Sequence, residues 1–404
     1  MNSIVSSGTT ASQTDASKAR IPKVAIVHDW LVIYGGAERV LEHIIDMYPQ
    51  ADIFSLIDFV PEQQRHFLRG KTPNVSFLQK IPTAAKNYPK FLPLMPLAIE
   101  QFDLSSYDLV ISSSYCVAKG VLTGPNQVHV CYCHSPMRYA WDHYHEYLRE
   151  MHLQSGLKSW FARWQLHKIR TWDVRSNNSV DHFVSNSRFV ARRIAKFYGR
   201  ESHIVNPPID TKLFNLTIPK EEYYVTAGRF APFKRLDIVA KAFSLMPDKK
   251  LFILGDGPEM EKIRACSGPN VVLTGFLPPS QVKEHLSKAK AFLFPSEEDF
   301  GIVPVEAQAC GTPVIAFGSG GALETVIGQN DAKGRQPTGH FFYEQSPQAI
   351  VEAVHEFERK AQQGLYDPAF IHEHAQFFAI DSFKTRFAAE VQFALTRHEQ
   401  FEPS

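Results

Sequence analysis

The chain has 404 residues, of which 44% are hydrophobic and 21% charged, and its formal net charge at pH 7 is +1. A chain of this length can hold two α/β domains, each with its own core. The near-neutral charge gives no general case for nucleic acid as a partner. The five cysteines form an odd, sparse set, which indicates free thiols in a reducing compartment rather than a disulfide framework.

The beginning of the chain and its hydropathy bear on its location. Residues 1–20 are rich in Ser, Thr and Ala and contain no apolar segment, so we expect a disordered tail and no secretory signal. The longest apolar run, 91–99, contains two prolines and is too short to span a bilayer. We therefore expect a cytoplasmic protein without a membrane-spanning segment.

Short apolar runs alternate with helical stretches in the first half of the chain. This alternation predicts an α/β fold with a doubly wound parallel sheet. Gly35 and Gly36 follow the first run and lead into an amphipathic helix over 37–47. The expected strands cover residues 24–28, 52–56, 109–112, 128–132 and 182–185.

The same alternation starts again near residue 223, after a polar stretch that begins with Asn-Pro-Pro-Ile-Asp at 206–210. We expect this stretch to be the linker and hinge between a first domain, 21–206, and a second domain, 207–381. The expected strands of the second domain begin near 223 and continue at 251–254, 271–273, 291–294 and 314–316.

Two carboxylates, Glu298 and Glu306, stand eight positions apart around a Phe-Gly turn that follows a short apolar strand. Gly301 is expected to open a helix, so that the N–H groups of Gly301, Ile302 and Val303 point into the crevice at the strand's carboxyl end. An open α/β sheet binds ligands there, and a helix N-terminus suits a phosphate. An anion with a carboxylate on each side is typical of a phosphorylated polyol.

Two cations, Arg229 and Lys234, stand five positions apart in the loop after the strand near 223. Arg can hold an oxyanion in a bidentate fork and Lys supplies a compact charge, a pair that suits a diphosphate. A lone Glu is most often a solvated surface acid. The cation pair followed by the carboxylate pair argues against that interpretation for Glu298 and Glu306.

The Gly-Arg-Phe-x-x-x-Lys stretch at 228–234 and the Glu-x7-Glu stretch at 298–306 resemble those of the retaining glycosyltransferases of family 4. The resemblance covers about residues 22–395. It implies the GT-B fold, in which two Rossmann-like, doubly wound parallel-sheet domains face each other across a cleft. It also implies that the last helix, about 382–398, crosses back onto the first domain. Further short stretches that support the resemblance occur in the expected order, at 35–36, 206–210, 255–258 and 275–276.

Stretches 27–31, 35–39 and 131–139 resemble a bacterial subgroup, similar to mannosyltransferases that build O-antigen and exopolysaccharide repeat units. This implies retaining transfer of mannose from GDP-mannose to a polyprenyl-diphosphate-linked or glycan acceptor. A UDP-sugar donor remains an alternative, as does a GT-B enzyme that hydrolyses or epimerises a nucleotide sugar. The non-enzyme alternative is a nucleotide- or glycan-binding subunit.

The resemblance implies roles on the second, nucleotide-sugar-binding domain. Arg229, Lys234 and the amides at 301–303 would stabilise the leaving diphosphate by charge. Glu298 would contact the donor sugar, and Glu306 would bind the ribose hydroxyls.

The remaining donor-side candidates come from both halves of the chain. Gly35 and Gly36 would let the backbone of the first domain approach the diphosphate. Gly275 and Phe276 are donor-side candidates by resemblance. His134, just past a predicted strand end, would lie near the donor sugar and join Glu298, Arg229 and Lys234 as catalytic candidates, although a lone His is more often a core or surface residue.

His28 and Asp29 follow the end of the first strand and are acceptor-side candidates, with helix capping or core hydrogen bonding as the alternative. The chain contains no Asp-x-Asp motif. We therefore expect no metal and no other cofactor in the transfer reaction, with cations and amides in the metal's place.

Two basic and aromatic segments, 79–100 and 158–172, are candidates for peripheral contact with the inner face of the plasma membrane. The Trp spacing in 158–172 equally fits a helical face packed into the first domain, with its cations reaching to solvent. In 79–100 the prolines oppose a regular core helix and favour surface contact.

Overall fold

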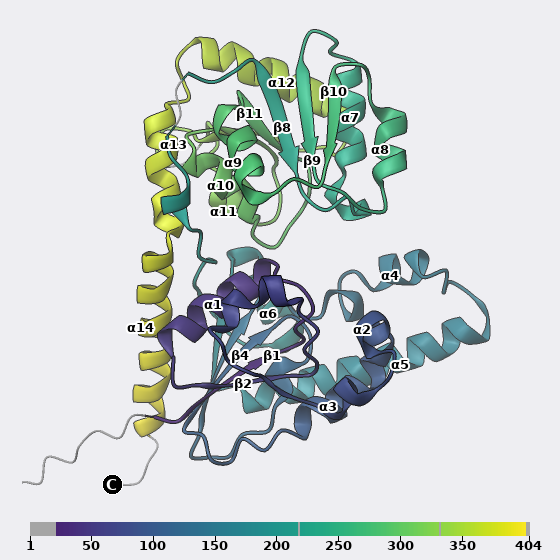
Figure 1. Ribbon diagram of the computed structural model, residues 1–404, viewed down its shortest axis with the longest axis vertical. Coiled ribbons are helices and arrows are strands. Elements are labelled where there is room, and N and C mark those ends of the chain that lie inside the picture. The colour runs from purple at the N-terminus through teal and green to yellow at the C-terminus, as the bar shows by residue number, and fades with distance from the viewer. Residues whose placement is uncertain (1–21, 217–218, 331–332, 401–404) are drawn as a thin grey trace, which may run out of the picture.

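Two α/β domains make up the computed structural model, which describes residues 22–216, 219–330 and 333–400 (Figure 1). The first sheet lies within residues 24–204 and the second within 223–342, on either side of the expected linker. The predicted disordered tail, 1–20, lies outside the described residues. The expected pair of doubly wound parallel sheets is confirmed.

Seven parallel strands form the first sheet, in the order β3-β2-β1-β4-β5-β6-β7. The order reverses between β1 and β4, and ligands of such sheets bind beyond the carboxyl ends at this reversal. The strands are β1 (Val24–His28), β2 (Asp52–Ser55), β3 (Asn74–Val75), β4 (Leu109–Ser114), β5 (Val128–Cys133), β6 (His182–Ser185) and β7 (His203–Ile204).

Helix α1 packs against the first sheet. The amphipathic α1 buries Val40, Leu41, Ile44 and Ile45 in the same core as the strand residue Ile26. The helices are α1 (Gly36–Met47), α2 (Ala84–Asn87), α3 (Met95–Glu100), α4 (Tyr144–Glu150), α5 (Gly156–Arg175) and α6 (Arg188–Tyr198).

Six parallel strands form the second sheet, in the order β10-β9-β8-β11-β12-β13, which reverses between β8 and β11. The strands are β8 (Tyr223–Ala227), β9 (Lys250–Leu254), β10 (Val271–Gly275), β11 (Ala291–Phe294), β12 (Val314–Phe317) and β13 (Gly339–Phe342). The helices are α7 (Leu236–Ser244), α8 (Met260–Cys266), α9 (Pro279–Lys288), α10 (Ile302–Ala309), α11 (Ala322–Thr325), α12 (Pro347–Gln362) and α13 (Pro368–Ala375).

The last helix, α14 (Ile380–Glu399), runs from the second domain back along the first (Figure 1). It buries Phe383, Phe387 and Val391 in the core of the first domain. The two chain crossings between the domains run side by side, because the N–H of Ile209 donates to the carbonyl of Phe378 at 2.9 Å. The connection between the domains is therefore a paired double crossing rather than one free linker.

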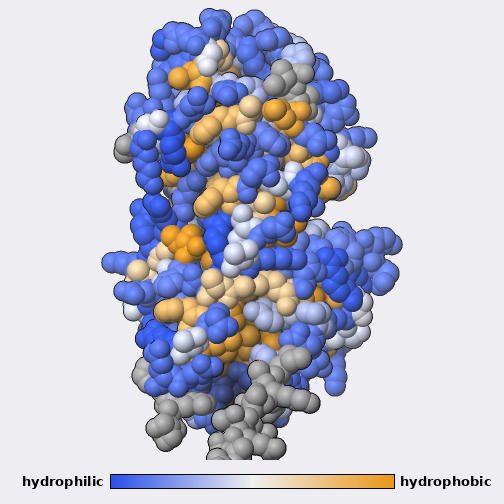
Figure 2. Space-filling model, turned by 90° about the vertical axis from the view of Figure 1, so that its left-hand side faces the viewer, coloured by the Kyte–Doolittle hydropathy of each residue, from blue (hydrophilic) through white to orange (hydrophobic). Residues whose placement is uncertain are grey.

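The surface on the side of α14 is mainly hydrophilic, with scattered hydrophobic patches (Figure 2). No helix within the described ranges combines the length and the apolar character needed to cross a bilayer.

Candidate active site

Lys234 and Glu298 form an ion pair at the carboxyl edge of the second sheet. Lys234 follows β8 and Glu298 follows β11, and these two strands are neighbours at the point where the strand order reverses. Nζ of Lys234 lies 2.6 Å from Oε1 of Glu298, and the hydroxyl of Ser296 donates to the same oxygen at 2.6 Å. The fold thus joins two predicted site residues where an open α/β sheet binds ligands.

The first turn of α10 lies in the loop region that carries Glu298. Gly301 is the N-cap, with a φ of 87°, and a Cβ at this position would come within 2.9 Å of the Phe294 ring, so both backbone and space require glycine. No side chain caps this helix. The N–H groups of its first turn, at Ile302 and Val303, lack intrahelical acceptors and suit an anion. The helix begins at Ile302, one residue later than the sequence predicts.

The glycine pair of the first domain lies against the start of α10. A Cβ on Gly36, the first residue of α1, would come 3.3 Å from Cδ1 of Ile302, the first residue of α10. The N–H of Gly35 donates to Oε2 of Glu38 at 2.9 Å, which holds the loop in place. Small residues therefore bring the N-termini of two helices from different domains together, and both helix dipoles favour an anion there.

Glu306 makes an interdomain ion pair that the sequence did not predict. Nη1 of Arg39, on α1, donates to Oε1 of the largely buried Glu306 at 2.6 Å. Burial lowers the pKa of Arg39, but the charge and the hydrogen bond of Glu306 reverse this and raise it overall. The available sequence signal was the position of Arg39 just after the glycine pair.

A second set of ion pairs anchors the loop that carries Glu298 to the first domain. The buried Arg193 of α6 forms a short hydrogen bond with Asp299 and an ion pair of 2.7 Å with Asp142. Nη1 of Arg138 lies 3.8 Å from Asp299. Sequence reasoning also missed Arg193 and Asp299, although Asp299 lies next to Glu298 in the motif.

His134 ends a chain of hydrogen bonds that starts beside the glycine pair. Oε1 of Glu38 lies 3.3 Å from Nε2 of His28, and Nδ1 of His28 lies 3.1 Å from the hydroxyl of Ser113. The same hydroxyl lies 2.8 Å from Nε2 of His134. Burial and the nearby charge of His28 lower the pKa of His134 to about 3, so its ring is neutral at pH 7. The first domain thus connects two candidate residues, His28 and His134.

Asp29 is fully buried and its carboxylate is fully engaged. Oδ1 accepts the N–H groups of Val117 and Ala118 at 2.5 and 2.7 Å, and Oδ2 accepts those of Tyr115 and Cys116 at 2.6 and 3.0 Å. These contacts organise the turn after β4 and leave no oxygen for a ligand. The acceptor-side role predicted for Asp29 is therefore wrong, and core hydrogen bonding describes it.

The other candidates take no part in the Lys234–Glu298 pair. Arg229 is exposed in the loop after β8 and makes no ion pair within the described part of the chain. Gly275 ends β10 at the sheet edge, and Phe276 is 81% exposed. Because β9 separates β10 from β8, Gly275 and Phe276 lie at the flank of the site rather than beside the ion pair.

Over the residues that the structure describes, a single group of three His, Cys, Asp or Glu side chains has metal-ligand spacing, and it consists of His182, His203 and Glu390 in the first domain and α14. Positive charge near the site comes from Lys234 and Arg229 of the second domain, from Arg39 of the first domain and from the helix N-termini.

Two family models match the chain, one over the part that holds the first sheet and one over the part that holds the second. Residues 34–213 match the model described as Glycosyltransferase Family 4, and residues 209–364 match the model described as Glycosyl transferases group 1.

Curated relatives align with part of the chain. A GDP-mannose-dependent alpha-(1-6)-phosphatidylinositol monomannoside mannosyltransferase from Mycolicibacterium smegmatis is 30% identical over 189 residues, which are 39% of this chain and 50% of that protein. A D-inositol 3-phosphate glycosyltransferase from Acidothermus cellulolyticus is 31% identical over 182 residues, which are 37% of this chain and 40% of that protein. The chain therefore spans half or less of the length of these relatives.

Solved structures match nearly the whole chain. Anabaena HepE in complex with UDP and glucose has a TM-score of 0.66 at 16% identity, over 92% of this chain and 100% of that chain. Sucrose-phosphate synthase from Thermosynechococcus elongatus has a TM-score of 0.69 at 17% identity, over 93% of this chain and 100% of that chain. At such identities the likeness shows the fold. That fold is GT-B. The two adjoining family models show that the chain belongs to the family 4 glycosyltransferases.

Proposed function

We propose that the protein transfers mannose from GDP-mannose to a lipid-linked or glycan acceptor, with retention of the anomeric configuration, in the synthesis of a bacterial surface polysaccharide. The observation that carries the proposal is the Lys234–Glu298 ion pair beside the uncapped first turn of α10. Cations and amides suit a diphosphate, and a carboxylate suits the hydroxyls of a sugar.

The reaction breaks the bond between the anomeric carbon and the diphosphate oxygen. Negative charge grows on the diphosphate, where Lys234, Arg229 and the first amides of α10 stabilise it. Glu298 orients the donor sugar as its ring gains oxocarbenium character. The acceptor hydroxyl attacks from the face that the diphosphate leaves, and its proton passes to the departing phosphate. Attack on the same face retains the anomeric configuration without a covalent intermediate on the protein.

Two interdomain contacts support a donor site between the domains. Gly36 lies against Ile302, and Arg39 pairs with Glu306 at 2.6 Å. Closure of the two domains around a donor would exclude water from the leaving diphosphate and would favour transfer over hydrolysis. His134 would face the sugar and acceptor from the first domain, with the buried His28 behind it in the same hydrogen-bond chain.

The choice of mannose and guanine is supported by the M. smegmatis relative, which is named as GDP-mannose-dependent. A UDP-sugar is the second candidate, because the structurally similar HepE was solved in complex with UDP and glucose. Incubation with a panel of nucleotide sugars and a lipid-linked acceptor tests the choice. GDP release and mannosylated acceptor are expected from GDP-mannose. Nucleotide release that is the same with and without acceptor would indicate a hydrolase. Absence of nucleotide release from every donor would indicate a binding subunit.

The surface of the first domain supports a membrane-borne acceptor. At the start of α5, Leu157 is 90%, Trp160 68% and Phe161 53% exposed. This end of α5 projects from the side of the first domain away from α14 (Figure 1). The core-packing interpretation of 158–172 thus holds for Leu166 and Ile169, which are buried, but not for the first turns of the helix.

The segment 79–100 is divided in the same way. Tyr88 and Phe91 pack partly against the core, whereas Leu94 and Leu97 are exposed beside the exposed lysines at 80, 86 and 90. Exposed rings and cations together suit the interface of an anionic bilayer. Under the proposal, the first domain rests on the inner face of the plasma membrane and collects its acceptor there.

A further inference from the structure

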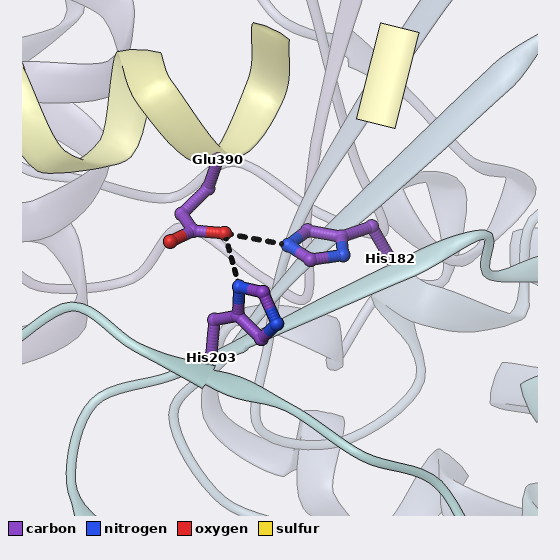
Figure 3. Close-up of side chains that lie close together, drawn as sticks. All are labelled: His182, His203 and Glu390. Carbon is purple, nitrogen blue, oxygen red and sulfur yellow. Dashed lines mark hydrogen bonds and ion pairs between the residues drawn. The ribbon is translucent and has the colours of Figure 1, made fainter. Parts of the chain in front are cut away.

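Three side chains from three separate elements converge outside the transfer site (Figure 3). His182 begins β6, His203 begins β7, and Glu390 lies on α14. Oε2 of Glu390 lies 2.9 Å from Nε2 of His182 and 2.7 Å from Nδ1 of His203. All three ligand atoms lie within 4.8 Å of one another.

The position of this cluster separates it from sugar transfer. His182 and His203 are the first residues of parallel strands, so the cluster lies at the amino edge of the first sheet. The candidate transfer site lies at the carboxyl edges of the sheets. The cluster instead joins the last two strands of the first sheet to α14, the helix that returns from the second domain.

Two imidazole nitrogens and one carboxylate oxygen are a ligand set typical of Zn²⁺ with an open fourth position. Metal bonds of about 2.0–2.2 Å in a tetrahedron place neighbouring ligand atoms about 3.4 Å apart. The carboxylate oxygen is nearer than this to both nitrogens, so a metal would lengthen the two separations by about 0.5 and about 0.7 Å. His203 is half-exposed, which leaves the fourth position to water.

The surroundings hold the ligands in place. The two imidazoles meet edge to face at 4.8 Å, and the Phe393 ring lies 5.4 and 5.5 Å from them. Arg200 and Arg397 line the adjoining depression and oppose a cation, whereas Asp181 in the same depression and Glu390 favour one.

We propose that His182, His203 and Glu390 bind a divalent transition-metal ion of the zinc class, which fastens α14 to the edge of the first sheet. The site is structural. A metal that binds only the folded protein raises its stability by mass action. Because α14 packs in the first core and continues from the hinge, the ion would also limit how far the second domain can swing.

The first experiment uses the full chain, stripped with chelator and desalted, and titrates it with ZnCl₂ in a calorimeter and in thermal unfolding. One ion per chain and a rise in Tm are expected. His203→Ala and Glu390→Gln should each weaken zinc binding by more than the roughly 10–100-fold that the loss of an outer-shell partner causes, and should abolish the rise in Tm. Both side chains are partly exposed, which favours folding of the variants.

The matched control is His398→Ala. His398 lies on the same helix and lines the same depression, but it is eight residues beyond Glu390, about 12 Å along the helix axis. It should bind zinc as the wild type does. Absence of zinc binding in the wild type would overturn the proposal, as would equal binding by wild type, His203→Ala and Glu390→Gln. Co²⁺ gives a second readout, because the tetrahedral ion absorbs visible light when bound and should do so only while all three ligands are present.

Discussion

Arg39 and Glu306 connect the two domains through an ion pair of 2.6 Å, although 267 positions separate them in the chain. The carboxylate that the family resemblance assigns to the donor's ribose is therefore already occupied by the other domain. The side chain of Arg39 is 43% exposed and that of Glu306 is 11% exposed. Arg39 can thus swing into water when a ribose arrives, whereas Glu306 stays in the site.

Glu306→Ala and Arg39→Ala should therefore have unequal effects on the binding of free GDP. The Glu306 variant loses the ribose contact and should bind GDP more weakly. The Arg39 variant removes a competitor for Glu306 and should bind GDP at least as tightly as the wild type. Calorimetry of both variants measures this. An equal loss of affinity in the two would show that Arg39 itself contacts the nucleotide.

Lys234→Ala and Arg229→Ala should each reduce turnover by about 10²–10³, the usual effect of removing one stabilising donor from a developing anion. Lys241→Ala, an exposed lysine on α7, is the matched control and should keep wild-type turnover. Initial rates with saturating donor measure the effect, and circular dichroism checks folding. Wild-type turnover in a folded Lys234 variant would remove Lys234 from the mechanism.

Chelator should leave the initial rate of sugar transfer unchanged, because the cations and amides of the site supply the charge that a metal would supply. The same treatment should lower the Tm if the His182–His203–Glu390 site holds zinc. Rate and Tm are measured on one sample, at an assay temperature well below the transition. A rate abolished by chelator and restored by Mg²⁺ or Mn²⁺ would contradict the expectation for the reaction.

Acid should destabilise the protein through His134. The folded state holds the pKa of His134 near 3, whereas an unfolded histidine titrates near 6.5. Between these values the unfolded chain binds a proton that the folded chain does not, so the free energy of unfolding falls as the pH drops from about 6.5 toward 3. Denaturant unfolding at pH 7 and pH 4.5 measures how much free energy of unfolding is lost on acidification. This loss should be smaller in His134→Gln than in the wild type. The control His398→Gln should lose as much free energy of unfolding as the wild type. An equal loss in all three proteins would show that His134 is not the cause of the acid destabilisation.

Binding to anionic vesicles should depend on the start of α5. Trp160→Ser with Phe161→Ser should weaken cosedimentation with anionic vesicles, since both rings are exposed. Replacement of Lys80, Lys86 and Lys90 by Ser should weaken it further, by about 1 kcal/mol for each lysine near the surface. Leu245→Ser, an exposed apolar residue of the second domain, is the control. Equal partitioning onto neutral and anionic vesicles would exclude an electrostatic contribution.

The strands that the sequence predicted are those with an apolar run of their own. The strand predicted at 128–132 is β5, Val128–Cys133, and the one at 291–294 is β11, Ala291–Phe294. The sequence missed β3 and β7, which have two residues each. Both are edge strands, and such short segments carry no periodic signal. It also missed β13, whose residues Gly339–Phe342 follow a polar stretch.

The sequence by itself determined what depends on local pattern. Apolar runs specified the parallel strands, and the spacing of Arg229, Lys234, Glu298 and Glu306 indicated a phosphate site at strand ends. The tertiary structure decided which partners meet. Glu306 pairs with Arg39, and Glu390 reaches His182, because domain docking and the return of α14 bring distant segments together. Burial decided the role of Asp29, because a carboxylate enclosed by four backbone N–H groups has no oxygen left for a ligand.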